Sequence, residues 1–176
     1  MTLKPLRKRL EEVSKRTSLR LDIIQQDYLL SWLLIGIFQH PQLKSTLVFK
    51  GGTSLKKGYF GEYRFSEDLD FTMRGGTTPP NLLKLITEAC KQAEEQMREY
   101  APIWLNVKKY EEKQPHPEGQ QAFTVNAQFP WQSEPLTKAM IEISQDEAIV
   151  FELTRKRLLH NYGEAIEQEM YVYSLE

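Results

Sequence analysis

The sequence FKGGTSLKKGYFGEYRFSEDLDFTM, residues 49–73, places two glycines after one predicted strand and two aspartates within the next. Residues 46–50 are β-branched or apolar, Gly51 and Gly52 end that strand, and residues 53–60 resemble the first turns of a helix. Residues 68–73 alternate strictly between polar and apolar side chains, as half-buried strands do. The stretch therefore predicts a strand, a glycine turn, a short helix and a second strand.

The glycine turn has the chemistry of a phosphate-binding site. A helix that begins directly after a strand exposes backbone N–H groups at its N-terminus, where the helix dipole also favours an anion. Gly51 and Gly52 allow an anion to approach the backbone closely, and Thr53 and Ser54 add two hydroxyl groups. An ordinary strand-to-helix turn has the same composition, so this motif alone leaves both interpretations open.

The two aspartates indicate a cation. Residues two apart in a strand share a face, so Asp68 and Asp70 lie together while Leu69 and Phe71 point into the core. Neighbouring carboxylates repel each other when both are ionised, unless a cation lies nearby. Hard oxygen ligands with room for phosphates favour Mg²⁺. The alternative is a solvated strand face that binds nothing.

Together, the two motifs predict a site for a nucleoside triphosphate. The glycine turn would hold the phosphates, and Asp68 and Asp70 would hold Mg²⁺ against them. A pair of metal ions in such a site activates an attacking hydroxyl and stabilises the leaving pyrophosphate. The expected chemistry is therefore phosphoryl transfer.

Residues 50–71, KGGTSLKKGYFGEYRFSEDLDF, resemble the signature of the AbiEii/AbiGii-type nucleotidyltransferase toxins of the DNA-polymerase-beta-like superfamily. The superfamily pattern is Gly-Gly or Gly-Ser, a spacer that is slightly longer here, and Asp-apolar-Asp/Glu-apolar. The segment RFSEDLDF is the more specific match to the toxin family. The resemblance implies a polymerase-beta-type α+β core, two Mg²⁺ ions, an NTP donor, and RNA as acceptor, with the tRNA 3′ end as one candidate.

The resemblance also implies further site residues. The superfamily takes a third carboxylate from a later strand, and Glu142 in KAMIEIS is the candidate general base or metal ligand, with Glu147 as the alternative. Arg64 and Ser66 match the family motif beside the aspartates. Lys56 and Lys57 follow the turn by one helical step, and either could reach phosphates. Arg64, Ser66 and Lys56 are assigned to nucleotide binding, and ordinary surface side chains are the alternative for each.

The rest of the chain has an α+β pattern with a mixed sheet flanked by helices. Apolar spacing predicts helices at residues 21–39 and 81–100, and a charged N-terminal segment, 1–18, contains a short helix at 5–15. Strands are predicted at residues 104–109, 122–129, 138–144, 148–153 and 170–174. Residues 1–176 are therefore interpreted as a single nucleotidyltransferase domain.

Composition limits the classes of function. The 23 basic and 24 acidic side chains give a net charge of −1, so attraction to a polyanion would have to be local. Cys90 is the only cysteine, which excludes an intramolecular disulfide and suits a reducing cytoplasm. The first residues are too charged for a signal peptide, and the most apolar run, 28–38, has about half the length of a membrane span. A cytoplasmic protein without a membrane contact is expected.

Two short basic patches are candidates for contact with RNA. They are Arg155–Arg157 and the lysines at 108–109, with the aromatic residues Trp104, Tyr110 and Tyr162 near them in sequence. Each patch taken alone is more often a solvated surface. The three histidines have no metal-ligand spacing, so zinc is not expected.

Three functions remain open from the sequence. The resemblance favours a toxin of a toxin–antitoxin or phage-defence system, with a cognate antitoxin encoded alongside. Toxins of the family are usually longer, with a C-terminal helical region for which this sequence has no counterpart, so a truncated or non-catalytic module that binds nucleotide or a partner is the second interpretation. An exposed sheet face would then favour a homo-oligomer. A Mg²⁺-dependent phosphohydrolase, with water as the nucleophile, is the third.

Overall fold

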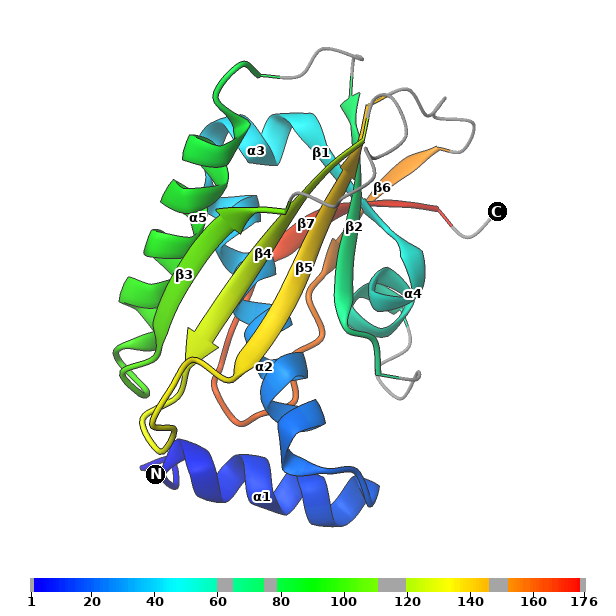
Figure 1. The fold of residues 1–176 in the computed structure, drawn as a ribbon. Helices are drawn as coiled ribbons and strands as arrows, with labels where there is room; N and C mark the ends of the chain where they lie inside the picture. Colours follow the sequence, from blue (N-terminus) through cyan, green and yellow to red (C-terminus); the bar gives the residue numbers. More distant parts are fainter. Residues whose placement is uncertain (1, 60–64, 75–78, 111–119, 146–151, 175–176) are drawn as a thin grey trace.

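The computed structural model describes residues 2–59, 65–74, 79–110, 120–145 and 152–174. Its helices are α1 (Leu6–Thr17), α2 (Leu21–Gln39), α3 (Pro41–Thr46), α4 (Gly51–Ser54) and α5 (Leu82–Met97), with a π-helical turn, η1 (Leu55–Tyr59). Its strands are β1 (Leu47–Lys50), β2 (Asp68–Met73), β3 (Trp104–Lys109), β4 (Gln120–Gln128), β5 (Thr137–Ser144), β6 (Leu153–Arg157) and β7 (Glu169–Tyr173). Figure 1 shows these elements as one sheet with helices packed against it, which confirms the predicted α+β class.

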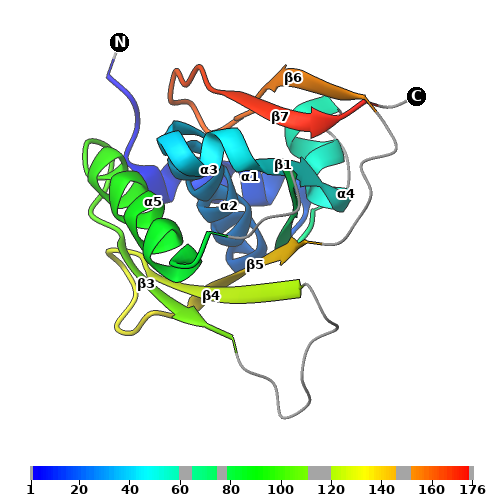
Figure 2. The ribbon, with the colours of Figure 1, turned by 90° about the horizontal axis from the view of Figure 1, so that it is seen from above.

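The strands of the described residues form one mixed sheet in the order β3-β4-β5-β2-β1-β7-β6. Strand pairs β2/β5 and β1/β7 are parallel, and the other neighbours are antiparallel. Seen from above, the sheet curves around α2, α3 and α5, so that β3–β5 and β6–β7 lie on opposite sides of these helices (Figure 2). The glycine turn thus directly follows β1, and the aspartates lie on the neighbouring strand β2 in the middle of the sheet.

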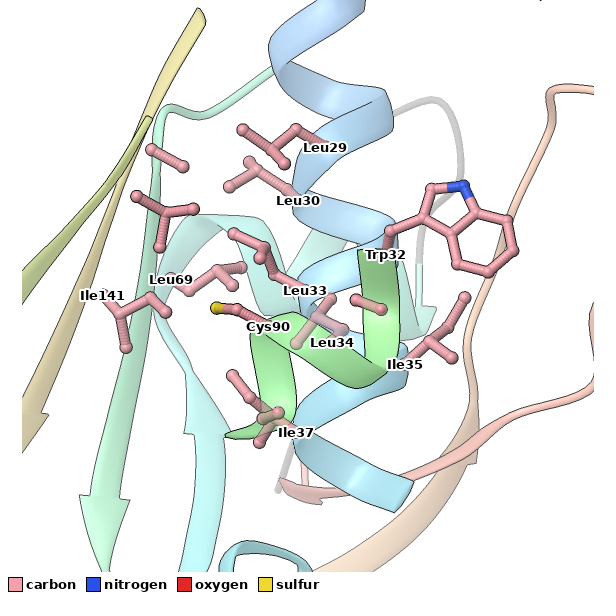
Figure 3. Packing of buried hydrophobic residues seen from close by; sticks show 14 of the residues in the cluster. Leu29, Leu30, Trp32, Leu33, Leu34, Ile35, Ile37, Leu69, Cys90 and Ile141 are labelled. Carbon is pink, nitrogen blue, oxygen red and sulfur yellow. The ribbon is translucent and has the colours of Figure 1, made fainter. Parts of the chain in front are cut away.

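Helix α2 forms the centre of the core. Almost every side chain from Ile24 to Phe38 is buried, and Leu69 of β2 and Ile141 of β5 point towards this helix (Figure 3). By length and composition α2 would also suit a membrane span, but most of the helix is buried within the fold. Its apolar character is therefore accounted for by packing against the sheet and α5.

Several predicted elements occur with the expected bounds or close to them. Helix α2 and strands β2 and β3 match the predicted residues, while β1, β4, β5, β7 and α5 differ by one to three residues at one or both ends. Helix α3 was not predicted. Strand β6 begins at Leu153, which is the last residue of the expected strand 148–153. Most of the rest of that expected strand lies outside the described residues. Helix α1 buries one face, Leu6, Leu10 and Val13, against the body of the protein.

Candidate active site

The three predicted carboxylates lie on one face of the two parallel central strands. Leu69 and Phe71 are fully buried, so Asp68 and Asp70, at the alternate positions of β2, face away from α2. In the parallel pair, Asp70 is the register partner of Glu142 on β5. Because register partners point to the same face, the fold brings Glu142 beside the aspartates from more than seventy residues away in sequence. All three are half-buried.

The glycine turn meets Asp70 directly. Gly51 has a φ of 83°, in the left-handed region that favours glycine. A Cβ at this position would lie only 2.7 Å from Oδ2 of Asp70. Gly51 is therefore needed both for the conformation of the turn and for the close approach of the carboxylate.

Thr53 and Ser54 stabilise the turn from within. Thr53 Oγ1 donates a hydrogen bond to the backbone carbonyl of Asp68, and Ser54 Oγ donates one to the carbonyl of Gly51 at 2.7 Å. Both side chains are buried. Their hydroxyl protons are thus used inside the protein, so the turn presents its backbone N–H groups as the donors for an anion.

The environment of Asp68 favours a bound cation. Partial burial and the negative charges of Asp70 and Glu67 raise the pKa of Asp68, and the charge of Lys138 opposes this shift. Across the described ranges, no group of three or more His, Cys, Asp or Glu side chains converges into a preformed metal centre. Magnesium commonly binds through one or two carboxylates and completes its shell with water and substrate phosphates, and the pair Asp68 and Asp70 fits that requirement.

Lys50 joins this face of the sheet, and sequence reasoning did not select it. It is the register partner of Asp70 on β1, so Lys50, Asp70 and Glu142 form one row across three strands. Its Nζ donates a hydrogen bond to Ser144 Oγ at 3.4 Å, which brings the ammonium group across β2 to β5. The available signal was its position, as the last residue of the first strand directly before the glycines.

Comparison with known families gives a match over most of the chain. The sequence profile of the AbiEii nucleotidyl transferase toxins of type IV toxin–antitoxin systems matches residues 32–176. The chain belongs to the AbiEii family. AbiEii proteins are nucleotidyltransferase toxins, which implies a nucleotide substrate and an antitoxin partner. A search of curated proteins finds no match. The match includes the glycine turn, the aspartates and Glu142, whereas α1 and the first half of α2 precede it.

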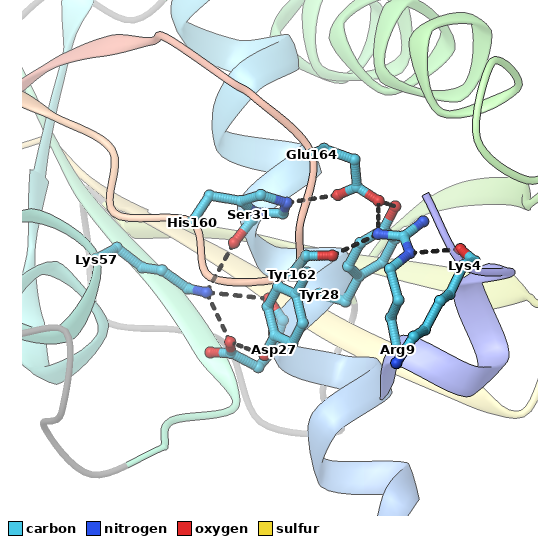
Figure 4. A network of polar contacts seen from close by, with 9 residues as sticks. All are labelled: Lys4, Arg9, Asp27, Tyr28, Ser31, Lys57, His160, Tyr162 and Glu164. Atoms are coloured by element: carbon cyan, nitrogen blue, oxygen red, sulfur yellow. Dashed lines mark hydrogen bonds and ion pairs between the residues drawn. The ribbon is translucent and has the colours of Figure 1, made fainter. Parts of the chain in front are cut away.

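The lysines after the turn have different surroundings in this AbiEii chain. Lys56 is 7% exposed, and its Nζ lies 4.2 Å from the centroid of the Phe65 ring. Lys57 points into the core, where its Nζ lies 2.8 Å from Oδ2 of Asp27 and 2.7 Å from Ser31 Oγ (Figure 4). Lys56 and Lys57 were both considered for phosphate contact, but the ammonium group of Lys57 is instead held in a buried ion pair with Asp27.

Two other assigned residues flank the aspartates. Ser66 is half-buried and lies two residues before β2. Arg64 and the alternative third carboxylate, Glu147, lie outside the described residues.

A buried polar network connects the turn to distant parts of the AbiEii chain (Figure 4). The Tyr162 hydroxyl donates to Asp27, whose pKa is lowered because the charges of Lys57 and Lys56 outweigh the effect of burial. Glu164 accepts hydrogen bonds from Arg9 of α1 and from Tyr28, the latter at 3.0 Å. The backbone N–H of Leu159 also donates to the carbonyl of Lys57 at 2.7 Å. The C-terminal segment therefore holds η1 in place.

The two arginines of one basic patch form exposed ion pairs with nearby glutamates. Arg155 and Arg157 lie 3.5 Å and 3.9 Å from Glu169 and Glu167, respectively. Tyr162 is buried in the polar network and is not available to an RNA base. The predicted stacking of an RNA base on Tyr162 is therefore wrong, whereas an RNA contact by residues 155–157 stays a prediction.

Proposed function

We propose that this chain is a Mg²⁺-dependent nucleotidyltransferase that transfers a nucleoside monophosphate from an NTP to a hydroxyl of RNA, with the tRNA 3′ end as one candidate acceptor. The observation that carries the proposal is the convergence of Gly51, Asp70 and Glu142. A glycine turn from β1 contacts a carboxylate on β2, which in turn has a carboxylate as its partner on β5. Membership of the AbiEii family supports the same reaction class.

In this reaction the oxygen of the acceptor hydroxyl attacks the α-phosphorus of the NTP. The new phosphorus–oxygen bond replaces the bond to the β-phosphate oxygen, and pyrophosphate leaves with that electron pair. Glu142 accepts the hydroxyl proton, or orients the hydroxyl for its loss. When Mg²⁺ is bound, it supplies charge neutralisation of the phosphates and of the attacking oxygen.

Each of the remaining residues has a binding role in the proposal. Asp68 and Asp70 hold the cation, and the backbone at Gly51 and Gly52 holds the triphosphate. Lys56, Arg64 and Ser66 are proposed to contact phosphate oxygens, and Lys50 adds positive charge to the same row. The polar hydroxyls of Thr53 and Ser54 keep the turn in shape. The reaction is proposed for the cytoplasm, where NTPs, Mg²⁺ and RNA are present.

The first experiment is thermal melting of the chain with each of the four NTPs, with and without Mg²⁺, beside Asp70→Asn. A ligand at one hundred times its dissociation constant stabilises a fold by about 2.7 kcal/mol, which is a visible shift in Tm. We expect a Mg²⁺-dependent shift that the variant loses. Asp22→Asn, an exposed aspartate at the start of α2, is the matched control and should keep the shift.

The second experiment follows the α-phosphate of the NTP that binds. Label in RNA together with released pyrophosphate supports the transferase. Binding without any turnover supports a nucleotide-binding module, and release of inorganic phosphate without labelled RNA supports a phosphohydrolase. Absence of NTP binding in every condition would contradict all three.

A further inference from the structure

The face of the sheet that carries the carboxylates continues beyond the candidate active site. Leu69 and Ile141 point towards α2, so the residues next to them on β2 and β5 point to the opposite, outer face. Strand alternation and register extend this outer face over β4 to the edge strand β3. In Figures 1 and 2, helices α1, α2, α3 and α5 all lie on the other side of β3, β4 and β5.

Register places mostly polar side chains on this outer face, with the half-buried Met140 and the buried Thr124 between Asp68 and Lys108. One row runs from Asp68 through Met140 and Thr124 to Lys108. The adjacent row runs from Lys138 through Asn126 to Asn106, and the last contains Gln128 and Trp104. At about 4.8 Å between strands and about 3.3 Å per residue, Trp104 lies roughly 20 Å from Asp68 along the face.

Trp104 is the outermost member of this face. Its side chain is 69% exposed, whereas Trp32 is 2% exposed and belongs to the core. The alternate residues of β3, Leu105 and Val107, pack inward against the core cluster. An indole held outward on a strand is a stacking surface for a base or another flat ring.

The charge of the outer face is positive next to the carboxylates. On β3, on β4 from Thr124 to Gln128 and on β5 from Lys138 to Met140, the outer-face residues include two lysines, Lys108 and Lys138, and no acidic residue. Within the described residues neither lysine forms an ion pair, and the side-chain amides of Asn106 and Asn126 form no hydrogen bond. The arginines of β6, by contrast, are paired with glutamates.

We propose that the outer face of β3, β4 and β5 is a binding track for a single-stranded nucleic acid whose end reaches the carboxylates. Trp104 would stack on a base, Lys108 and Lys138 would contact phosphates, and the two asparagines would meet base edges. A single strand is required because the bases of a duplex are stacked on each other and cannot cover an indole. This inference rests on the proposed function, since it names the acceptor of the same site.

The test measures binding of a fluorescently labelled single-stranded RNA of about 12 nucleotides to the full chain, without NTP or Mg²⁺. Trp104→Ala should weaken binding by about 5- to 100-fold, because base stacking on an aromatic ring contributes that range of affinity. Trp104→Phe should restore most of it. A duplex of the same sequence should bind less tightly than the single strand.

The lysines are tested by the salt dependence of the same binding. Replacing Lys108 and Lys138 together by Gln should reduce the slope of log affinity against log salt by about one for each lysine. The matched control replaces Lys84 and Lys91, two exposed lysines of α5 on the other side of the sheet, and should leave the slope unchanged. Leu83→Ala, which removes a 41% exposed side chain from α5, is the control for Trp104.

The outcomes separate this inference from the proposed transferase. Weak RNA binding in Trp104→Ala with an unchanged NTP-dependent Tm shift supports the track. RNA that binds through Trp104 in a protein that never transfers nucleotide would leave the track in place and contradict the transferase. Equal RNA affinity for the parent and the variants, or no RNA binding by the parent, would overturn the track. If Trp104→Ala instead loses binding to a protein partner and keeps its RNA affinity, the outer face is a protein-binding surface and the track is overturned.

Discussion

Asp70 on β2 and Glu142 on β5 are register partners in a parallel strand pair, with Lys50 as the partner of Asp70 on its other side. The row therefore consists of one ammonium group followed by two carboxylates, on three adjacent strands. Such a row is held by backbone hydrogen bonds of the central sheet, so its spacing does not depend on flexible loops. A rigid position is what a group needs if it is to remove a proton from a bound hydroxyl.

Glu142→Gln tests the role of the third carboxylate. The amide cannot accept the acceptor hydroxyl's proton, so we expect transfer to fall by about 10²- to 10⁴-fold while NTP binding changes little. The measurement compares labelled RNA formed per unit time with the NTP-dependent Tm shift. Glu95→Gln, an exposed position on α5, is the control. Full activity in Glu142→Gln would assign the third carboxylate to another residue.

Gly51→Ala tests the contact between the turn and Asp70. A methyl group at this position would lie 2.7 Å from Oδ2 of Asp70, and the φ of 83° is costly for any residue with a Cβ, by about 1–2 kcal/mol. We expect a lower Tm and a large loss of NTP affinity. Calorimetric unfolding and NTP titration measure the two effects.

Gly58→Ala is the matched control for the turn. A Cβ there would meet its nearest atoms at 3.8 Å or more, and Gly58 does not have a positive φ. The substitution should therefore keep NTP binding. Equal NTP affinity in Gly51→Ala and the parent would show that the turn does not hold the triphosphate.

The central elements could be predicted because their patterns are local. The alternation in DLDF specifies a half-buried strand, and the apolar spacing from Leu21 to Gln39 specifies a core helix, so both were found with their bounds. Glu142 was selected by resemblance, and β2–β5 register places it beside Asp70. The roles assigned to these residues stay predictions, since a fold alone does not test them.

The remainder depends on contacts between distant segments. Lys50 is placed at the site by its neighbours Asp70 and Ser144, which lie on other strands. The sequence around Lys50 does not reveal these neighbours. The ion pair of Lys57 with Asp27 is also long-range, and Lys57 in isolation resembles a solvated helix residue. Trp104 belongs to the carboxylate face only through the register of three strand pairs.

Lys57→Met tests the buried ion pair. The side chain of Lys57 is 1% exposed and that of Asp27 is 2% exposed, so removing the ammonium leaves an uncompensated charge in the core. Loss of one partner of such a pair costs about 3–5 kcal/mol, and we expect a fall of that size in the free energy of unfolding. Urea unfolding at neutral pH measures it.

The double variant Asp27→Asn with Lys57→Met provides the control for this pair. It removes both charges, so part of the lost stability should return, and the double-mutant cycle gives the coupling energy. Lys44→Met, at an exposed position of α3, should have little effect. A Lys57→Met variant as stable as the parent would contradict a structural role for the pair.

The pH dependence of stability should report the repulsion at Asp68. Burial and the charges of Asp70 and Glu67 raise the pKa of Asp68 above its ordinary value of 3.8. The folded state therefore holds this proton more tightly than the unfolded chain does, and the associated stability is lost as pH rises through the folded pKa. At neutral pH, ionised Asp68 is a destabilising charge.

Asp68→Asn should consequently raise Tm at pH 7, in the absence of Mg²⁺, although it removes a proposed metal ligand. The gain should shrink as pH falls through the raised pKa of Asp68, because protonation of the parent then leaves a neutral group at this position in both proteins. Mg²⁺ should stabilise the parent more than the variant, because the cation offsets a repulsion that the variant lacks. Melting curves across this pH range, with Asp22→Asn as the exposed control, measure all three effects. A lower Tm for Asp68→Asn at pH 7 without Mg²⁺ would mean that Asp68 is held by stabilising contacts and is not poised to receive a cation.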